Sequence, residues 1–170
     1  MKASAKRIGV LLLAGALAAV TANSLNPRRI PWVQDWSGQV EAQAAEQDIQ
    51  MISRSDAFGK LHSAEVLFVD ARPAEHFARG HIAGAVSAPF DQFDERFSVI
   101  VDLIDSGCEL VIYCTNRECD DALLLAIELK SMGCTNAVLY VDGFEGWKKH
   151  GGATTSSPVD AVPPPTGTGL

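Results

Sequence analysis

The chain has 170 residues, of which 47% are apolar and 21% are charged, so it is long enough for one domain with a hydrophobic core and has an ordinary globular composition. Residues 31–170 hold nine basic and all 21 acidic residues, a net charge of −12. This charge argues against nucleic acid as a partner, because Lys and Arg contacts to phosphates supply most of the affinity in such complexes.

The first 25 residues combine a basic start with an apolar run. Lys2, Lys6 and Arg7 are followed by an uncharged stretch of 18 residues, Ile8–Leu25. Such a stretch suits either a membrane anchor or a cleaved secretory signal, and Val20-Thr21-Ala22 is an acceptable cleavage site. We therefore expect residues 1–25 to hold the domain at a membrane on its extracytoplasmic side, periplasmic or at the cell surface, or else to secrete it.

The segments on either side of the central region have the composition of linkers. Residues 26–47 contain two prolines, Trp32 and Trp36, and no long apolar period, which predicts a juxtamembrane linker with a short helix. Residues 153–170 are rich in Gly, Pro, Ser and Thr, which predicts a disordered tail. The folded domain is thus expected over residues 48–152.

Within residues 48–152 strand and helix patterns alternate. Short runs rich in β-branched residues are expected to be strands at 49–53, 66–72, 85–89, 109–114 and 137–141. Helical patterns lie between them at 54–64, 93–105 and 120–133. This alternation predicts an α/β fold with a parallel sheet that is covered by helices on both faces.

Cys114 ends the fourth of these strands, and the next helix begins within a few residues. In an open parallel sheet, ligands gather outside the carboxyl ends of the strands. Free backbone amides and the positive end of a helix dipole at such a turn favour thiolate over thiol. Cys114 is therefore a candidate nucleophile, and the alternative is a structural cysteine that closes a core strand.

Three motifs in this order resemble the rhodanese-like domain family over about residues 48–152. They are "VDARPAEHFARGHIAGAVSAP" at 69–89, the strand ending in "YC" at 113–114, and "VLYVDGFEGWKKHGG" at 138–152. The resemblance implies a rhodanese-like sheet of five parallel strands with helices on both faces. It also implies a sulfurtransferase in which the thiolate of Cys114 takes sulfur from a small donor such as thiosulfate, becomes a persulfide, and passes the sulfur to a thiol acceptor, without a metal or cofactor.

Other residues of these motifs are expected to have structural roles. Asp70 and Arg72 follow one strand and can pair with each other to fix neighbouring loops. His81, between Gly80 and Gly84, is expected to satisfy hydrogen bonds in a tight turn, and Trp147 to anchor the last helix.

The loop after Cys114 departs from the family's common Cys-x-x-Gly-x-Arg-Ser pattern. It reads Cys114, Thr115, Asn116, Arg117, Glu118, Cys119, Asp120, Asp121, and its carboxylates should repel an anionic donor unless an aspartate turns away to cap the helix. Cys119 suggests a second function: it can resolve a persulfide or mixed disulfide on Cys114, which would make a dithiol oxidoreductase or redox sensor that acts on a thiol-redox protein. A third possibility is a binding module that has lost turnover.

The remaining cysteines, Cys108 and Cys134, lie before the two strands that the family places side by side. We expect them to form a structural disulfide, the alternative being two buried thiols. A four-cysteine zinc site is disfavoured, because no Cys-x-x-Cys spacing is present.

Overall fold

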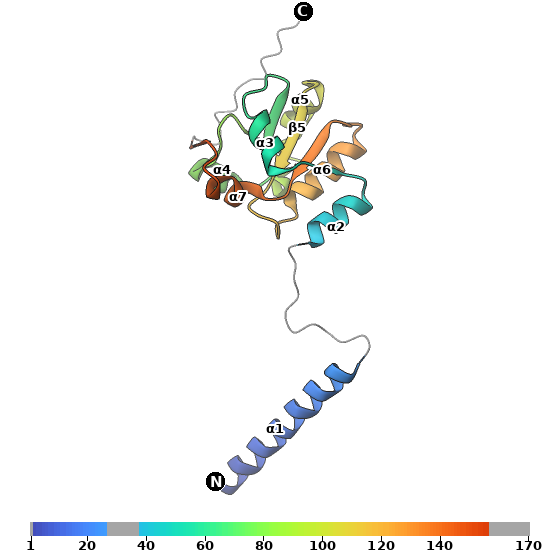
Figure 1. The fold of residues 1–170 in the computed structure, drawn as a ribbon, viewed down its shortest axis with the longest axis vertical. Coiled ribbons are helices and arrows are strands. Elements are labelled where there is room, and N and C mark those ends of the chain that lie inside the picture. The colour runs from blue at the N-terminus through green and yellow to red at the C-terminus, as the bar shows by residue number, and fades with distance from the viewer. Residues whose placement is uncertain (1, 27–37, 157–170) are drawn as a thin grey trace, which may run out of the picture. The chain divides into compact units, whose positions relative to one another are not determined.

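The computed structural model describes residues 2–26 and 38–156 (Figure 1). Helix α1, Lys2–Leu25, forms a unit of its own. Its residues 6–25 have a mean hydropathy of 2.0 and are long and apolar enough to cross a membrane, a property that a signal sequence near the N-terminus shares. Trp32 and Trp36 of the expected linker lie outside the described residues.

The domain is built on the expected five-stranded parallel sheet, whose strand order is β1-β6-β5-β2-β4. The strands are β1 (Gln50–Met51), β2 (Val66–Asp70), β4 (Val86–Ser87), β5 (Glu109–Tyr113) and β6 (Ala137–Tyr140). Strand β5 is central, with Asp70 of β2 opposite Tyr113 on one side and Tyr140 of β6 opposite Tyr113 on the other. The carboxyl ends of three strands therefore meet at one point of the edge.

Helices cover both faces of this sheet, as predicted (Figure 1). One face packs against α2 (Gln39–Glu46), α5 (Phe97–Asp105), α6 (Asp121–Ser131) and the 3₁₀ turn η1 (Phe90–Gln92). The other packs against α3 (Arg54–Lys60), α4 (Ala74–Arg79) and α7 (Gly143–Lys149). Because successive side chains of a strand point to opposite faces, Ile112 and Cys114 belong to the α6 face, and Val111 and Tyr113 to the α7 face.

Two segments differ from the sequence prediction. Helix α2 is in the place of the short helix expected within the linker, but its Val40 and Ala44 are buried in the core, so the folded domain begins before residue 48. At the other end, Thr154–Thr155 form strand β7, which pairs antiparallel with β3 (His81–Ile82) in a second, two-stranded sheet. The expected disordered tail is therefore ordered at its start, and residues 157–170 lie outside the described part of the chain.

Candidate active site: a disulfide loop at the carboxyl edge of the sheet

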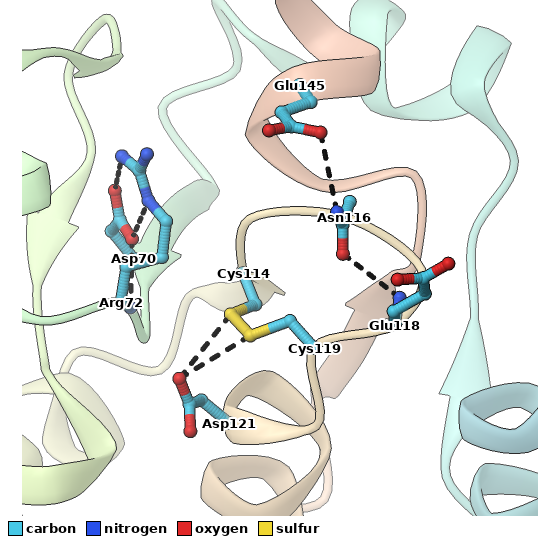
Figure 2. The surroundings of a disulfide bond; sticks show 8 residues. All are labelled: Asp70, Arg72, Cys114, Asn116, Glu118, Cys119, Asp121 and Glu145. Carbon is cyan, nitrogen blue, oxygen red and sulfur yellow. Dashed lines mark hydrogen bonds and ion pairs between the residues drawn. A yellow bond between two sulfur atoms is a disulfide. The ribbon is translucent and has the colours of Figure 1, made fainter. Parts of the chain in front are cut away.

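Cys114 lies at the carboxyl edge of the sheet, directly after the central strand β5. Residues 114–120, here called the cysteine loop, lead from this strand to α6, which begins at Asp121. In the structure Cys114 and Cys119 are joined by a disulfide, with their Cα atoms 6.1 Å apart (Figure 2). The loop thus carries both sulfur atoms at the place where the sequence predicted a reactive thiol.

The two sulfur atoms differ in access but share one neighbour. Cys114 is only 2% exposed, whereas Cys119 is half-buried. A carboxylate oxygen of Asp121, Oδ2, lies 3.6 Å from the sulfur of Cys114 and 3.5 Å from that of Cys119 (Figure 2). An incoming thiol therefore meets Cys119 first, and Asp121 is within reach of either sulfur.

The two aspartates at the start of α6 have different surroundings. Asp120 is the exposed N-cap residue, but its side chain makes no capping hydrogen bond, so the expected helix-capping role is not seen there. Asp121 is half-buried, and burial raises the pKa of its carboxyl, as do the negative charges of Asp120 and Asp91. Asp121 is therefore protonated more readily than an ordinary aspartate.

Part of the loop's hydrogen-bonding capacity is used within the loop. Asn116 accepts from the amide of Glu118 through its side-chain oxygen, at 3.1 Å, and from the amide of Cys119 through its carbonyl, at 3.3 Å. In this conformation those two amides are not directed at a bound anion. The free backbone amides expected after Cys114 therefore do not include those of Glu118 and Cys119.

The start of α7 holds the loop from the other side. The amides of Phe144 and Glu145 donate to the carbonyls of Cys114 and Thr115, at 2.8 and 2.9 Å. Gly143 has a φ of +63°, and a Cβ there would lie 2.7 Å from the carbonyl oxygens of Cys114 and Thr115, so only glycine allows this close approach. The sequence offered a signal that was missed, namely the Asp142-Gly143 pair between the end of β6 at Tyr140 and the start of α7.

Arg117 ties the loop to two other elements by ion pairs. Its guanidinium pairs with Glu41 of α2 and with Asp142, which also pairs with Arg54 of α3 at 3.2 Å. Burial alone would raise the pKa of Asp142, but hydrogen bonds and charge from Arg117 and Arg54 together hold that pKa below its ordinary value. These contacts fix the exposed half of the loop.

A cavity of about 440 Å³ borders the loop on its α7 side, at Thr115. Its lining includes the basic side chains of Arg79 and Lys148, and also Arg72, whose charge is paired with Asp70. The one acidic residue among its lining residues is Glu145. A cationic cavity therefore lies beside the loop in a domain that is otherwise strongly acidic.

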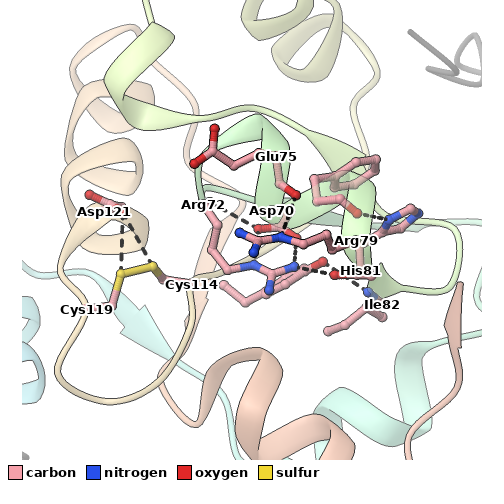
Figure 3. Close-up of polar contacts among 12 residues, drawn as sticks. Asp70, Arg72, Glu75, Arg79, His81, Ile82, Cys114, Cys119 and Asp121 are labelled. Carbon is pink, nitrogen blue, oxygen red and sulfur yellow. Dashed lines mark hydrogen bonds and ion pairs between the residues drawn. A yellow bond between two sulfur atoms is a disulfide. The ribbon is translucent and has the colours of Figure 1, made fainter. Parts of the chain in front are cut away.

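Asp70 and Arg72 form the pair that the sequence predicted, and the pair is buried. The guanidinium donates to both carboxylate oxygens, at 2.8 and 2.6 Å, and to the carbonyl of Gly80 at 2.8 Å (Figure 3). The ring of His81 lies 2.8 Å from the carbonyl of Phe77 and stacks on the ring of that residue. These contacts support the structural roles expected of all three motif residues.

Trp147 is fully buried between α7 and the sheet. Its ring packs on Phe58 and Phe68, and its indole N–H donates to the carbonyl of Ala153 at 2.9 Å. This arrangement supports the anchoring role expected from the sequence.

The disulfide expected between Cys108 and Cys134 is not formed, and both residues are free thiols. Leu110 pairs with Ala137, so two residues earlier the register places Cys108 opposite Thr135 rather than Cys134. The amide of Cys134 still donates to the carbonyl of Leu129 at the end of α6, at 3.0 Å. The expectation erred because Cys134 belongs to the end of the helix and not to the approach to β6.

One group of potential metal-ligating atoms occurs in the described part of the chain: the sulfurs of Cys114 and Cys119 and a carboxylate oxygen of Asp121, all within 4.8 Å of one another. While both sulfurs are in the disulfide, neither is a thiolate, which is the form that binds metals. The chemistry available to this arrangement is therefore thiol and disulfide exchange.

Part of the chain is similar in sequence to a curated protein. A curated relative, the HTH-type transcriptional regulator Rv0324 of Mycobacterium tuberculosis, is 31% identical over 68 residues, which is 40% of this chain and 28% of the relative. The chain thus spans little more than a quarter of the length of that relative.

Solved structures show the same fold at low sequence identity. The BH2092 protein from Bacillus halodurans has a TM-score of 0.57 at 19% identity, over 70% of this chain and 85% of that one. A thiosulfate sulfurtransferase from Pseudomonas aeruginosa has a TM-score of 0.56 at 16% identity, over 71% and 23%. The rhodanese-like domain of the Alr3790 protein from Anabaena sp. has a TM-score of 0.51 at 21% identity, over 66% and 83%.

The sequence match to a family model is more specific than these fold similarities. The rhodanese-like domain model matches residues 53–150, which include β2, the cysteine loop and α7. The match covers more than half of the chain, and we conclude that the chain belongs to the rhodanese-like domain family.

Proposed function

We propose that this domain is a sulfurtransferase that carries sulfane sulfur as a persulfide on Cys114 and discharges it through Cys119. The observation that carries the proposal is the disulfide between these two residues, in a loop that follows the central strand of a rhodanese-like domain. A bond between the two sulfurs is the product expected when Cys119 resolves a sulfur-loaded Cys114.

The reaction begins from the reduced loop. The thiolate of Cys114 attacks the outer sulfur of a donor such as thiosulfate, the sulfur–sulfur bond of the donor breaks, and sulfite leaves with the electron pair. The cationic cavity beside Thr115 supports an anionic donor, since its basic lining offsets the repulsion expected from Asp120 and Asp121.

Discharge uses the second cysteine. Once the outer sulfur has taken a proton from water, the thiolate of Cys119 attacks the sulfur of Cys114, the bond to the outer sulfur breaks, and hydrosulfide leaves as the disulfide forms. A dithiol partner, either a thiol-redox protein or a small dithiol, then reduces the disulfide in two exchange steps and is itself oxidised to a disulfide. In the alternative route, an acceptor thiol takes the outer sulfur directly.

The location we propose is the extracytoplasmic side of a membrane, with α1 as the anchor or, after cleavage, as a lost signal. The apolar composition of α1 supports this placement. A cysteine pair that is oxidised at rest fits a compartment in which disulfides persist.

A second candidate is a dithiol oxidoreductase or redox sensor that uses the same two cysteines without a sulfur donor. It is favoured by the loop amides of Glu118 and Cys119, which bond to Asn116 and not to a ligand. In this cycle Cys119 resolves a mixed disulfide between Cys114 and a partner protein.

Mass spectrometry of the full chain separates these functions. The chain is reduced, freed of reductant and incubated with thiosulfate, and the Cys119→Ser variant is treated in the same way. We expect the variant to gain about 32 Da as a stable persulfide, and the native chain to gain it briefly and then lose about 2 Da relative to the reduced form.

Two other outcomes would overturn the proposal. A Cys119→Ser variant that gains no sulfur from thiosulfate or from an organic persulfide, but traps mixed disulfides with a thiol-redox protein, would establish the dithiol function. A Cys114 that reacts with neither donor nor alkylating agent in the reduced chain would leave a binding module. Cys108→Ser is the matched control, because it removes a thiol outside the loop.

A further inference from the structure

Asp121 lies directly after the cysteine loop and beside its disulfide, at a position that no motif predicts. It is the first residue of α6, so the helix fixes its backbone, and its carboxylate oxygen lies almost equally close to the two bonded sulfurs, at 3.6 and 3.5 Å (Figure 3). In the disulfide neither sulfur carries a proton, so the carboxylate oxygen is in contact with both sulfurs but is not hydrogen-bonded to them. When the loop is reduced, either thiol can donate an S–H···O hydrogen bond to this oxygen.

The charged groups that face this carboxyl are all acidic. Asp120 precedes it as the N-cap residue of α6, and Asp91 faces it from η1; Cys114 and Cys119 are the other titratable groups beside it. Among the described residues Asp121 makes no ion pair with a Lys, Arg or His. Burial and the two acidic neighbours raise its pKa, so the neutral acid persists to a higher pH than in an ordinary aspartate.

We propose that Asp121 is a catalytic residue that transfers protons to and from the sulfur of Cys114. This role rests on the cysteine cycle proposed above, but it concerns the sulfur–sulfur bond and not the sulfur donor. The supporting geometry is a carboxyl group in contact with both reacting atoms, on the first residue of a helix.

The reductive step assigns a role to each group. A reductant thiolate attacks the half-buried sulfur of Cys119, the Cys114–Cys119 bond breaks, and the buried sulfur of Cys114 leaves with the electron pair. The Asp121 acid gives this sulfur its proton and becomes a carboxylate, while the reductant forms a mixed disulfide with Cys119. In the reverse direction the carboxylate takes the proton of the Cys114 thiol as the bond re-forms.

The two variants that test this role remove the same charge from adjacent residues. Asp121→Asn keeps the size of the side chain but cannot exchange a proton, and Asp120→Asn removes an exposed charge next to it while retaining a good N-cap residue. If Asp121 acted only through its charge, its Asn variant would react like the protonated native protein, fast at every pH. If it transfers a proton, the variant is slow at every pH.

The measurement is the rate at which dithiothreitol reduces the oxidised full chain, divided by the concentration of dithiothreitol thiolate at each pH. For the native protein we expect this rate constant to fall about tenfold as Asp121 ionises, less than the 10²–10⁴ typical of general acid catalysis because a thiolate is already a good leaving group. Asp121→Asn should be slow and independent of pH. Asp120→Asn should keep the native profile, with its midpoint moved to lower pH by the loss of a neighbouring negative charge.

Two results would overturn the assignment, namely an Asp121→Asn variant that is fast at every pH, or one that keeps the native profile. Circular dichroism and thermal melting of each variant identify any that fails to fold, and Asp121→Glu, which retains a titrating carboxyl, should then recover part of the pH dependence. Since the assay uses no sulfur donor, a chain that never forms a persulfide but shows this profile would refute the proposed sulfur transfer and leave the role of Asp121 intact.

Discussion

The two cysteine pairs lie at opposite edges of the same sheet and differ in how the chain brings them together. Cys114 and Cys119 share one loop at the carboxyl edge, where five residues of chain bring their Cα atoms to 6.1 Å, and they are bonded. Cys108 and Cys134 come from different elements at the amino edge and are free thiols. The comparison shows that a pair within one loop needs only a suitable turn, whereas a pair between elements needs a matching register.

The largest expected difference between the pairs is in reactivity. Cys114→Ser should abolish persulfide formation and all thiol turnover, because the variant lacks the sulfur that attacks the donor. Cys108→Ser, the matched control, should retain both, since that residue is remote from the loop. Both variants are assayed by sulfite release from thiosulfate and by the mass of the product. Equal losses in the two variants would contradict the conclusion that Cys114, and not Cys108, is the reactive cysteine.

A smaller effect is expected on stability. Closing a loop of about six residues stabilises a protein by about 2 kcal/mol in the chain-entropy treatment of disulfides. Reductant should therefore lower the free energy of unfolding of the native full chain, measured by urea titration, by about 2 kcal/mol. The double variant Cys114→Ser/Cys119→Ser should show no such change, and a loss of the same size in that variant would mean that the reductant acts at another site.

The smallest expected effect is a difference in alkylation rate between the two free thiols, Cys108 and Cys134. Cys134 is 4% exposed, and burial raises the pKa of its thiol, whereas Cys108 is partly exposed. Because the thiolate is the reactive form, iodoacetamide should modify Cys108 about tenfold faster than Cys134 near neutral pH, and labelling of Cys134 should rise steeply in the alkaline range. Peptide mass spectrometry measures both rates, and preferential labelling of Cys134 would contradict the buried position.

The sheet could be predicted because the signals that define it are local. The apolar runs around Leu67 and Val111 are typical of strands buried on both faces, and the helices between them require parallel pairing. By contrast, the pairing of His81–Ile82 with Thr154–Thr155 joins two segments that are only two residues long and far apart in sequence, and neither has an apolar period. No local pattern indicates such a strand.

The candidate site was predictable in its residues but not in its geometry. The position of Cys114 after an apolar strand and the nearby Cys119 are visible in the sequence, and the bond between them agrees with the pairing considered there. Which aspartate faces the sulfurs depends on where α6 begins and on the direction of one side chain. The sequence "DD" leaves these details open, and in the structure Asp121 faces the sulfurs while Asp120 is exposed.

The contacts of Ala153 and β7 limit how far a protease can shorten the domain from its C-terminal end. The carbonyl of Ala153 accepts hydrogen bonds from the indole N–H of Trp147 and from the amide of Ala83, at 2.9 and 3.1 Å. A protease that cuts after residue 156 removes none of the contacts described here, whereas one that cuts before Ala153 leaves a buried indole donor unpaired, which costs about 1–3 kcal/mol. Digestion of the folded chain should therefore yield a C-terminal boundary no earlier than β7.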